Sequence, residues 1–237
     1  MSRRSLWPWT GRFGRLGAIP AILLLHLGTY WVATRVNSAR PEEALWPLET
    51  AVDRAIPHLG WMWPAFWFAY PYVLVGASWA IWRLPSSLVS RAVVAFVVMT
   101  VIGASIQMLL PARSPWPADP HPIQQMVHDL ELNRPFASLP SMHVAFAVLT
   151  ALFAVRAARG RRWLQWGFAL GAGLISISTV TLKEHFVLDP VAGALLAGGV
   201  FLWWRQGTKR DAGVQGEPPG VTYDHLTSRA TTAARRR

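Results

Sequence analysis

The chain has 237 residues, of which 52% are hydrophobic and 15% charged, with a mean hydropathy of +0.27. This composition excludes an ordinary soluble globule, in which charged residues make up about a quarter of the sequence. The absence of cysteine excludes disulfides, zinc–thiolate sites and cysteine nucleophiles. The net charge of +11 does not indicate nucleic-acid binding, because the basic residues form no compact basic domain. The expected surroundings are therefore a lipid bilayer.

Six apolar stretches occupy most of the sequence. A helix needs about 20 apolar residues to cross a bilayer core of about 30 Å. The predicted spans cover residues 17–34, 60–82, 88–110, 139–155, 163–182 and 186–204. We expect the first to be a retained anchor, because no small-x-small signal-peptide cleavage site follows it. The predicted fold is all-α, an integral membrane bundle of six transmembrane helices.

The basic residues predict the orientation of these spans. Of the 23 lysines and arginines, 17 lie in the amino terminus, the second and fourth connections and the tail. Because such residues accumulate on the cytoplasmic side, we expect a multi-pass protein of the cell membrane with both termini cytoplasmic. The predicted division is a basic cytoplasmic segment over 1–16, a six-helix domain over 17–205, and a disordered basic cytoplasmic tail over 206–237.

Ionisable residues gather at the extracytoplasmic ends of the predicted spans, where their presence at membrane depth marks candidate functional groups. His185 and Asp189 are four residues apart, so they share one face at the start of a helix. A carboxylate that accepts the Nδ1 proton of a histidine leaves Nε2 free to act as a nucleophile or base. A self-satisfied polar pair without a catalytic role is the alternative.

A second group of polar residues surrounds the start of the fourth span. Ser141 is a preferred helix N-cap beside amide groups that can bind an anion, although simple capping would also explain it. His143 is placed to give a proton to a leaving oxygen. Arg113 and Lys183 are suited to hold phosphate oxygens, unless they only mark the membrane interface.

Together these residues predict phosphoryl transfer without a metal or other cofactor. We expect His185 to attack phosphorus and form a phosphohistidine, Asp189 to orient it, and His143 to protonate the departing group. A second acceptor then takes the phosphoryl group from the histidine. Water as that acceptor makes the protein a phosphatase, and an alcohol makes it a phosphotransferase.

At these positions the sequence resembles the type 2 phosphatidic acid phosphatase superfamily. The three motifs of that superfamily are Lys-x6-Arg-Pro, Pro-Ser-x-His and Ser-Arg-x5-His-x3-Asp. Residues 140–143 match the second, and residues 178–189 match the third except that Thr179 stands at its arginine position. Arg113 aligns with the arginine of the first motif, whose lysine and proline are replaced here.

The departures from these motifs resemble one branch, the inositol phosphorylceramide synthases and their bacterial relatives. Thr181 and Lys183 fit the Thr-x-x-Thr-Lys-x-His pattern of that branch, and residues 53–57 (Asp-Arg-Ala-Ile-Pro) also look like it. The resemblance implies that Ser178 and Thr181 join Ser141, Lys183 and Arg113 in binding the substrate phosphate.

The resemblance covers about residues 45–205 and implies a lipid phosphatase or phosphotransferase. Its substrate would be a lipid phosphate such as phosphatidic acid, a polyprenyl diphosphate or a phosphoinositide, taken from the bilayer at the extracytoplasmic face. Transfer of inositol phosphate to a lipid acceptor is an alternative within the same superfamily. The sequence predicts no oligomeric state.

Two other classes of function are alternatives to this prediction. A noncatalytic membrane protein or a transporter on the same fold would explain the degraded first motif. A metal-dependent hydrolase would use ligands from one outward connection, namely His121, His128, Asp129 and Glu131. Their spacing matches no defined metal site, so a solvated loop is the favoured interpretation.

Overall fold

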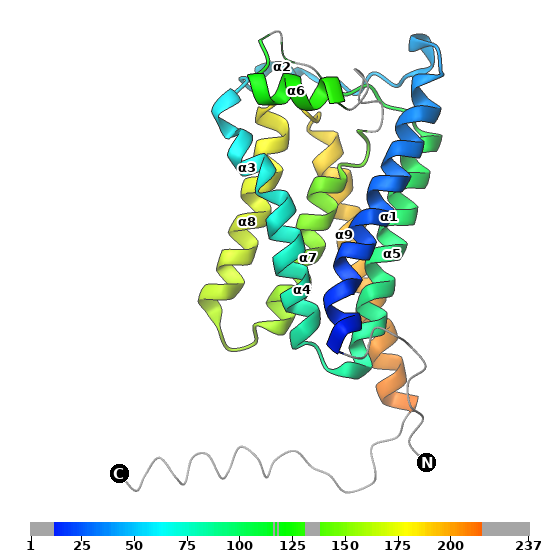
Figure 1. The fold of residues 1–237 in the computed structure, drawn as a ribbon, viewed down its shortest axis with the longest axis vertical. Coiled ribbons are helices and arrows are strands. Elements are labelled where there is room, and N and C mark those ends of the chain that lie inside the picture. Colours follow the sequence, from blue (N-terminus) through cyan, green and yellow to red (C-terminus); the bar gives the residue numbers. More distant parts are fainter. Residues whose placement is uncertain (1–11, 116, 118, 131–137, 215–237) are drawn as a thin grey trace, which may run out of the picture. The chain divides into compact units, whose positions relative to one another are not determined.

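The structure is a computed structural model, and it describes residues 12–115, 117, 119–130 and 138–214. All regular secondary structure in these ranges is helical, as the sequence predicts (Figure 1). The α-helices are α1 (Arg12–Ser38), α2 (Ala51–Ala55), α3 (Trp63–Trp67), α4 (Ala69–Arg83), α5 (Ser86–Leu109), α6 (Pro122–Leu130), α7 (Met142–Ala157), α8 (Arg162–Thr181) and α9 (Leu188–Val214). Two short 3-10 helices, η2 (Glu42–Ala44) and η3 (Gly60–Met62), lie between them.

Helices occur at all six predicted apolar stretches. Three of them are long and apolar enough to cross a membrane, over Gly17–Ser38, Ser86–Leu109 and Arg162–Thr181, while α7 is apolar but shorter. These helices indicate a multi-pass membrane protein. The count of six spans and the orientation of the termini stay predictions.

The second predicted span is divided. Residues 60–82 form η3, α3 and most of α4 instead of one continuous helix. Pro64 and Pro71 lack the amide proton that an interior helical residue donates, so each lies in the first turn of a new helix.

The last helix is longer than the predicted sixth span. Helix α9 continues beyond residue 205 to Val214, so the first part of the predicted tail is helical. Residues 1–11 and 215–237, which hold most of the predicted amino-terminal segment and tail, lie outside the described residues. Residues 1–202 and 203–237 form separate compact units, and every candidate site residue belongs to the first.

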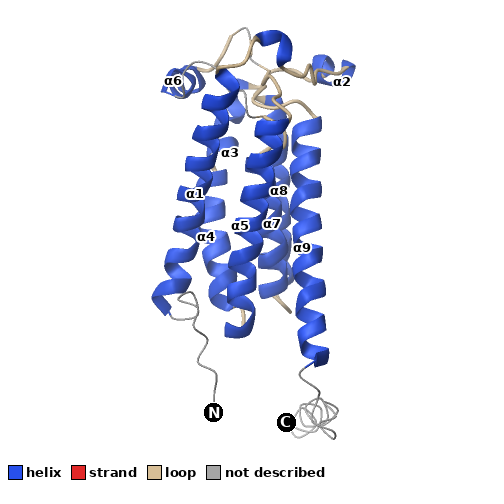
Figure 2. Cartoon of the chain, turned by 90° about the vertical axis from the view of Figure 1, so that its right-hand side faces the viewer, coloured by secondary structure: helices blue, strands red, loops and turns tan. Residues whose placement is uncertain are grey.

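Within the first unit, long helices run alongside one another and short ones lie at one end. Helix α1 packs against α5, and α7 packs against both α4 and α8 (Figure 1). Buried aromatic rings fill the space between α5 and α7, where Phe96 and Phe153 stack with their ring centroids 5.5 Å apart. Helices α2 and α6 lie at the same end of these long helices (Figure 2).

The starts of α7 and α9 approach each other unusually closely. The amide of Ser141 donates a hydrogen bond of 3.0 Å to the carbonyl oxygen of Asp189. A Cβ atom on Gly193 would overlap the carbonyl oxygen of Ser141. Glycine at this position therefore lets α9 hold Asp189 beside the amino terminus of α7.

We predict that Gly193→Ala destabilises the protein by about 1–3 kcal/mol, because the overlapping atom belongs to the backbone and cannot rotate away. The measurement is the thermal unfolding midpoint in detergent. Gly199→Ala is the matched control on the same helix, because a Cβ there meets no atom within 4 Å. Equal midpoints for the two variants would contradict the close approach.

Candidate active site

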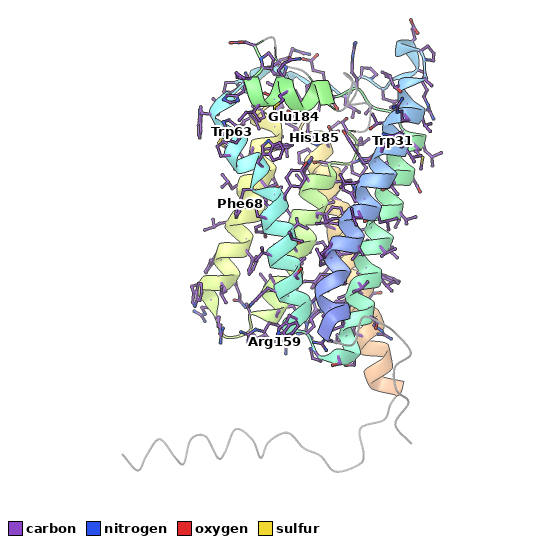
Figure 3. The ribbon with its side chains drawn as sticks, viewed as in Figure 1. Trp31, Trp63, Phe68, Arg159, Glu184 and His185 are labelled. Atoms are coloured by element: carbon purple, nitrogen blue, oxygen red, sulfur yellow. The ribbon has the colours of Figure 1, made fainter. Side chains whose placement is uncertain are left out.

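The predicted pair of His185 and Asp189 lies where α8 turns into α9. Nδ1 of His185 is 3.1 Å from Oδ2 of Asp189, and the amide of Phe186 donates to the same oxygen at 3.1 Å. Asp189 has no exposed surface. Because a carboxylate accepts hydrogen bonds, Nδ1 carries the proton and Nε2 keeps its lone pair. His185 lies beneath α6, next to Glu184 (Figure 3).

Several buried polar atoms have no hydrogen-bond partner among the described residues. They include Oδ1 of Asp189 and Oγ of Ser141. Ser141 is the N-cap residue of α7, yet its hydroxyl does not bond to the amides of the first turn. Simple capping therefore does not account for it. A buried polar atom without a partner is costly, so both oxygens are candidates to bond a polar ligand.

His143 is in the first turn of α7 and faces His185. The centroids of the two rings are 6.1 Å apart, which lets one phosphate ester contact both. The ring of Phe66 packs on His143 with a centroid distance of 4.6 Å. The hydroxyl of Tyr70 lies 3.5 Å from Nε2 of His143, at the limit for a hydrogen bond. Residues of α3 and α4 thus hold the second histidine from the side.

An apolar cavity of about 130 Å³ ends at these two histidines. Its lining comes from α1, α3, α4, α5, α6, α7, Ser114 and the turn that carries His185. Helix α1 provides four of the residues, Leu23, His26, Leu27 and Tyr30. The cavity therefore places the two histidines in a wall that is largely apolar but also includes Gln107, Gln124 and Glu184.

A second cavity, of about 450 Å³, also borders His185, and most of the residues that line it are ionisable. Asp53, His58 and Lys183 contribute to its wall. His185 lines both cavities.

The side chains of the other predicted phosphate ligands either bond to backbone carbonyl groups or lie outside the cavity walls. Lys183 donates hydrogen bonds of 2.6 Å to the carbonyl oxygens of Asp53 and Ile56, which uses two of its three ammonium protons. The hydroxyls of Ser178 and Thr181 donate to carbonyl groups of their own helix. Arg113 is exposed and is not part of either cavity wall. Phosphate binding by these four residues stays a prediction.

Sequence patterns did not single out Phe66, Tyr70 or the wall formed by α1. Aromatic residues are frequent throughout this chain, so nothing in their spacing marks these two. Asp53 was indicated only through the resemblance of residues 53–57.

The alternative metal site falls partly outside the described residues. Glu131 is not described, and neither are the side chains of His128 and Asp129. Nδ1 of His121 accepts a hydrogen bond from the amide of Ile123, and its ring packs near Trp63. The described side chains contain no group of three His, Cys, Asp or Glu residues that would hold a metal ion.

Comparison with known proteins shows the family. Residues 61–203, more than half of the chain, match the PAP2 superfamily, and the protein belongs to it. This is the superfamily of phosphatases and phosphotransferases whose motifs the site residues resemble. No curated protein and no solved structure matches the chain. The branch within the superfamily is not resolved.

The carboxylate of Asp53 contacts the turn that carries His185, where it accepts the amide of Val187 at 2.7 Å. Burial alone would raise the pKa of this carboxyl, but hydrogen bonds from Thr50 and the amide of Val187, together with nearby Lys183, hold it below its ordinary value. Since the folded pKa is lowered, the charge stabilises the fold above the unfolded pKa of 3.8, and this contribution is lost as the pH falls through the folded value.

We predict that wild type exceeds Asp53→Asn in thermal midpoint by a constant margin near neutral pH, and that the margin shrinks in acid below 3.8. The difference between the two proteins is measured from pH 7 downward in one detergent. A margin that does not change as the solution becomes acidic would contradict the charged state of Asp53.

Proposed function

We propose that the protein is a membrane-embedded, metal-independent phosphatase or phosphotransferase that acts on a lipid-linked phosphate ester. The observation that carries this proposal is the histidine pair. His185 has its Nδ1 proton bound by a fully buried carboxylate, and His143 lies 6.1 Å away at the start of α7. This is the arrangement that in-line attack and leaving-group protonation require.

In the first step, Nε2 of His185 attacks phosphorus and the bond from phosphorus to the leaving oxygen breaks. His143 gives its proton to that oxygen, so the departing group leaves as a neutral alcohol or a protonated phosphate. Asp189 stabilises the positive charge that develops on the ring of His185. The amide groups at the start of α7 are available for the oxygens of the transferred group.

In the second step, His143 removes a proton from water or from an alcohol. The oxygen of that acceptor attacks phosphorus, the phosphorus–nitrogen bond breaks, and its electron pair returns to Nε2 of His185. The enzyme is restored with His143 protonated. Hydrolysis and transfer therefore differ only in the acceptor, and transfer of inositol phosphate to a lipid is one form of the second.

The position of the site supports a lipid substrate and an extracytoplasmic location. The apolar cavity leads from the helices to His143 and His185. The basic connection between α7 and α8 contains Arg159, which lies at the opposite end of the helices from His185 (Figure 3). Since basic connections face the cytoplasm, the histidines belong on the other side of the membrane.

The central prediction concerns His185 and His143. With purified protein in a strong chelator and a panel of labelled lipid phosphates, we expect His185→Ala and His143→Ala to lose at least about a hundredfold in kcat/KM. The measurement follows the label into inorganic phosphate or into a new lipid formed with an added alcohol. The first product identifies a phosphatase and the second a phosphotransferase.

His121→Ala is the matched control, because this histidine lies outside both cavity walls. We expect it to retain wild-type activity. Loss of activity in this variant, together with inhibition by the chelator, would favour the metal-dependent alternative. Wild-type protein that transforms no substrate would favour the noncatalytic alternative.

A further prediction concerns the wall of the apolar cavity. Leu23→Trp fills part of that space, so we expect kcat/KM for long-chain lipid phosphates to fall about tenfold or more. Activity on a short-chain, water-soluble phosphate ester should stay within about twofold, because such a substrate leaves the cavity unfilled.

Leu24→Trp is the control for this change. Leu24 is the adjacent residue of α1, is 69% exposed and lies outside the cavity wall. We expect it to leave both activities unchanged. An equal loss on short and long substrates in Leu23→Trp would show that the cavity does not hold the lipid chain.

A further inference from the structure

The turn that carries His185 has little regular structure of its own. It connects Thr181, the last residue of α8, to Leu188, the first of α9. The amides of Glu184 and His185 both donate to the carbonyl oxygen of Thr179 at 3.1 Å. Lys183 has a φ of 59°, in the left-handed region that non-glycine residues rarely adopt. Such a conformation persists only where surrounding contacts hold it.

Those contacts come from α2 and from its C-cap residue Ile56, more than 120 residues away in the sequence. The ammonium group of Lys183 donates to the carbonyl oxygens of Asp53 and Ile56, each at 2.6 Å. The carboxylate of Asp53 accepts the amide of Val187 at 2.7 Å. Lys183 and Val187 lie two residues before and two residues after His185, so α2 holds the turn on both sides of the histidine.

Asp53 is itself fixed in place. Its second carboxylate oxygen accepts the amide of Thr50 at 2.7 Å and the hydroxyl of Thr50 at 2.5 Å. The amide of Asp53 in turn donates to the hydroxyl oxygen of Thr50 at 3.3 Å, which completes a capping box at the start of α2. The residue is only 5% exposed. A rigid, buried carboxylate with all these bonds is a suitable anchor for a backbone amide.

We propose that α2 is a positioning clamp for His185, in which Asp53 and Lys183 act as positioning residues. The clamp fixes the backbone on either side of the histidine, while Asp189 fixes the orientation of the ring. The proposal rests on the proposed function for its effect on catalysis. Helix α2 lies outside residues 61–203, whereas Lys183 and Val187 lie within them, so the clamp joins the matched part of the chain to a segment before it.

The effect on catalysis follows from geometry. A displacement of about 1 Å at a reacting group can reduce a rate about a hundredfold. We therefore expect Asp53→Asn to lower kcat about tenfold to a hundredfold, with KM changed by less than about threefold. The asparagine keeps the size of the side chain but places an amide nitrogen against one of the donors.

Lys183→Met is a second variant, which removes the two hydrogen bonds from Lys183 to the carbonyl oxygens of Asp53 and Ile56. If Lys183 acts through the clamp, the double variant with Asp53→Asn is slower than the poorer single variant by at most about threefold. If Lys183 instead binds the substrate phosphate, the two losses multiply, and Lys183→Met raises KM and weakens inhibition by inorganic phosphate. That second outcome would overturn the role of Lys183.

A measurement without substrate tests the clamp separately from the activity. Hydrogen exchange of the full chain in detergent, read on peptides over 182–188 and 142–157, reports the amide of Val187 and the helix α7. We expect Asp53→Asn to accelerate exchange over 182–188 about tenfold or more and to leave α7 unchanged. Glu49→Gln removes a charge from an exposed residue of the same segment and should change neither.

These readouts separate failure of the clamp from failure of the proposed function. Unchanged exchange over 182–188 in Asp53→Asn would overturn the clamp, even if the wild type is active. Accelerated exchange in a protein that transforms no substrate would support the clamp and refute the proposed function. If Asp53→Asn does not fold, Lys183→Met is read in the same exchange experiment with the same expected acceleration and the same overturning result.

Discussion

A carboxylate with no exposed surface must receive hydrogen bonds from the protein, and this requirement organises the end of the molecule where the histidines lie. Oδ2 of Asp189 takes its donors from the ring of His185 and the amide of Phe186. Its backbone carbonyl accepts the amide of Ser141, which brings the start of α7 to the same place. The hydrogen bonds of one buried residue therefore bring residues 140–143 and 178–189 together around one point.

Local sequence patterns predicted the features of the structure that depend on short spacings along the chain. Helices occur at every predicted apolar stretch, and the four-residue spacing of His185 and Asp189 gives the expected hydrogen bond. These features follow from the period of a helix, which is visible within a few residues. The division of residues 60–82 was missed, because the apolar composition outweighed two prolines that each begin a new helix.

Local sequence patterns do not predict contacts between segments that are far apart in the chain. Neither the bond from Asp53 to Val187 nor the wall that Leu23 and Leu27 give to the cavity leaves a periodic signal. Lys183 shows the same limit, because no local pattern indicates that its ammonium group donates to two carbonyl oxygens of another segment. Its role as a phosphate ligand stays a prediction. Only the three-dimensional arrangement reveals that a lysine at this position contacts the backbone of another segment.

The apolar cavity has one wall, in α1, that lies outside the segment shared with the superfamily. The histidines and the start of α7 lie inside that segment. In the function we propose, the part of the wall that α1 contributes and the two histidines are thus encoded in separate stretches of the sequence. Substitutions in α1 would then change the contact with a lipid chain without changing His143 or His185.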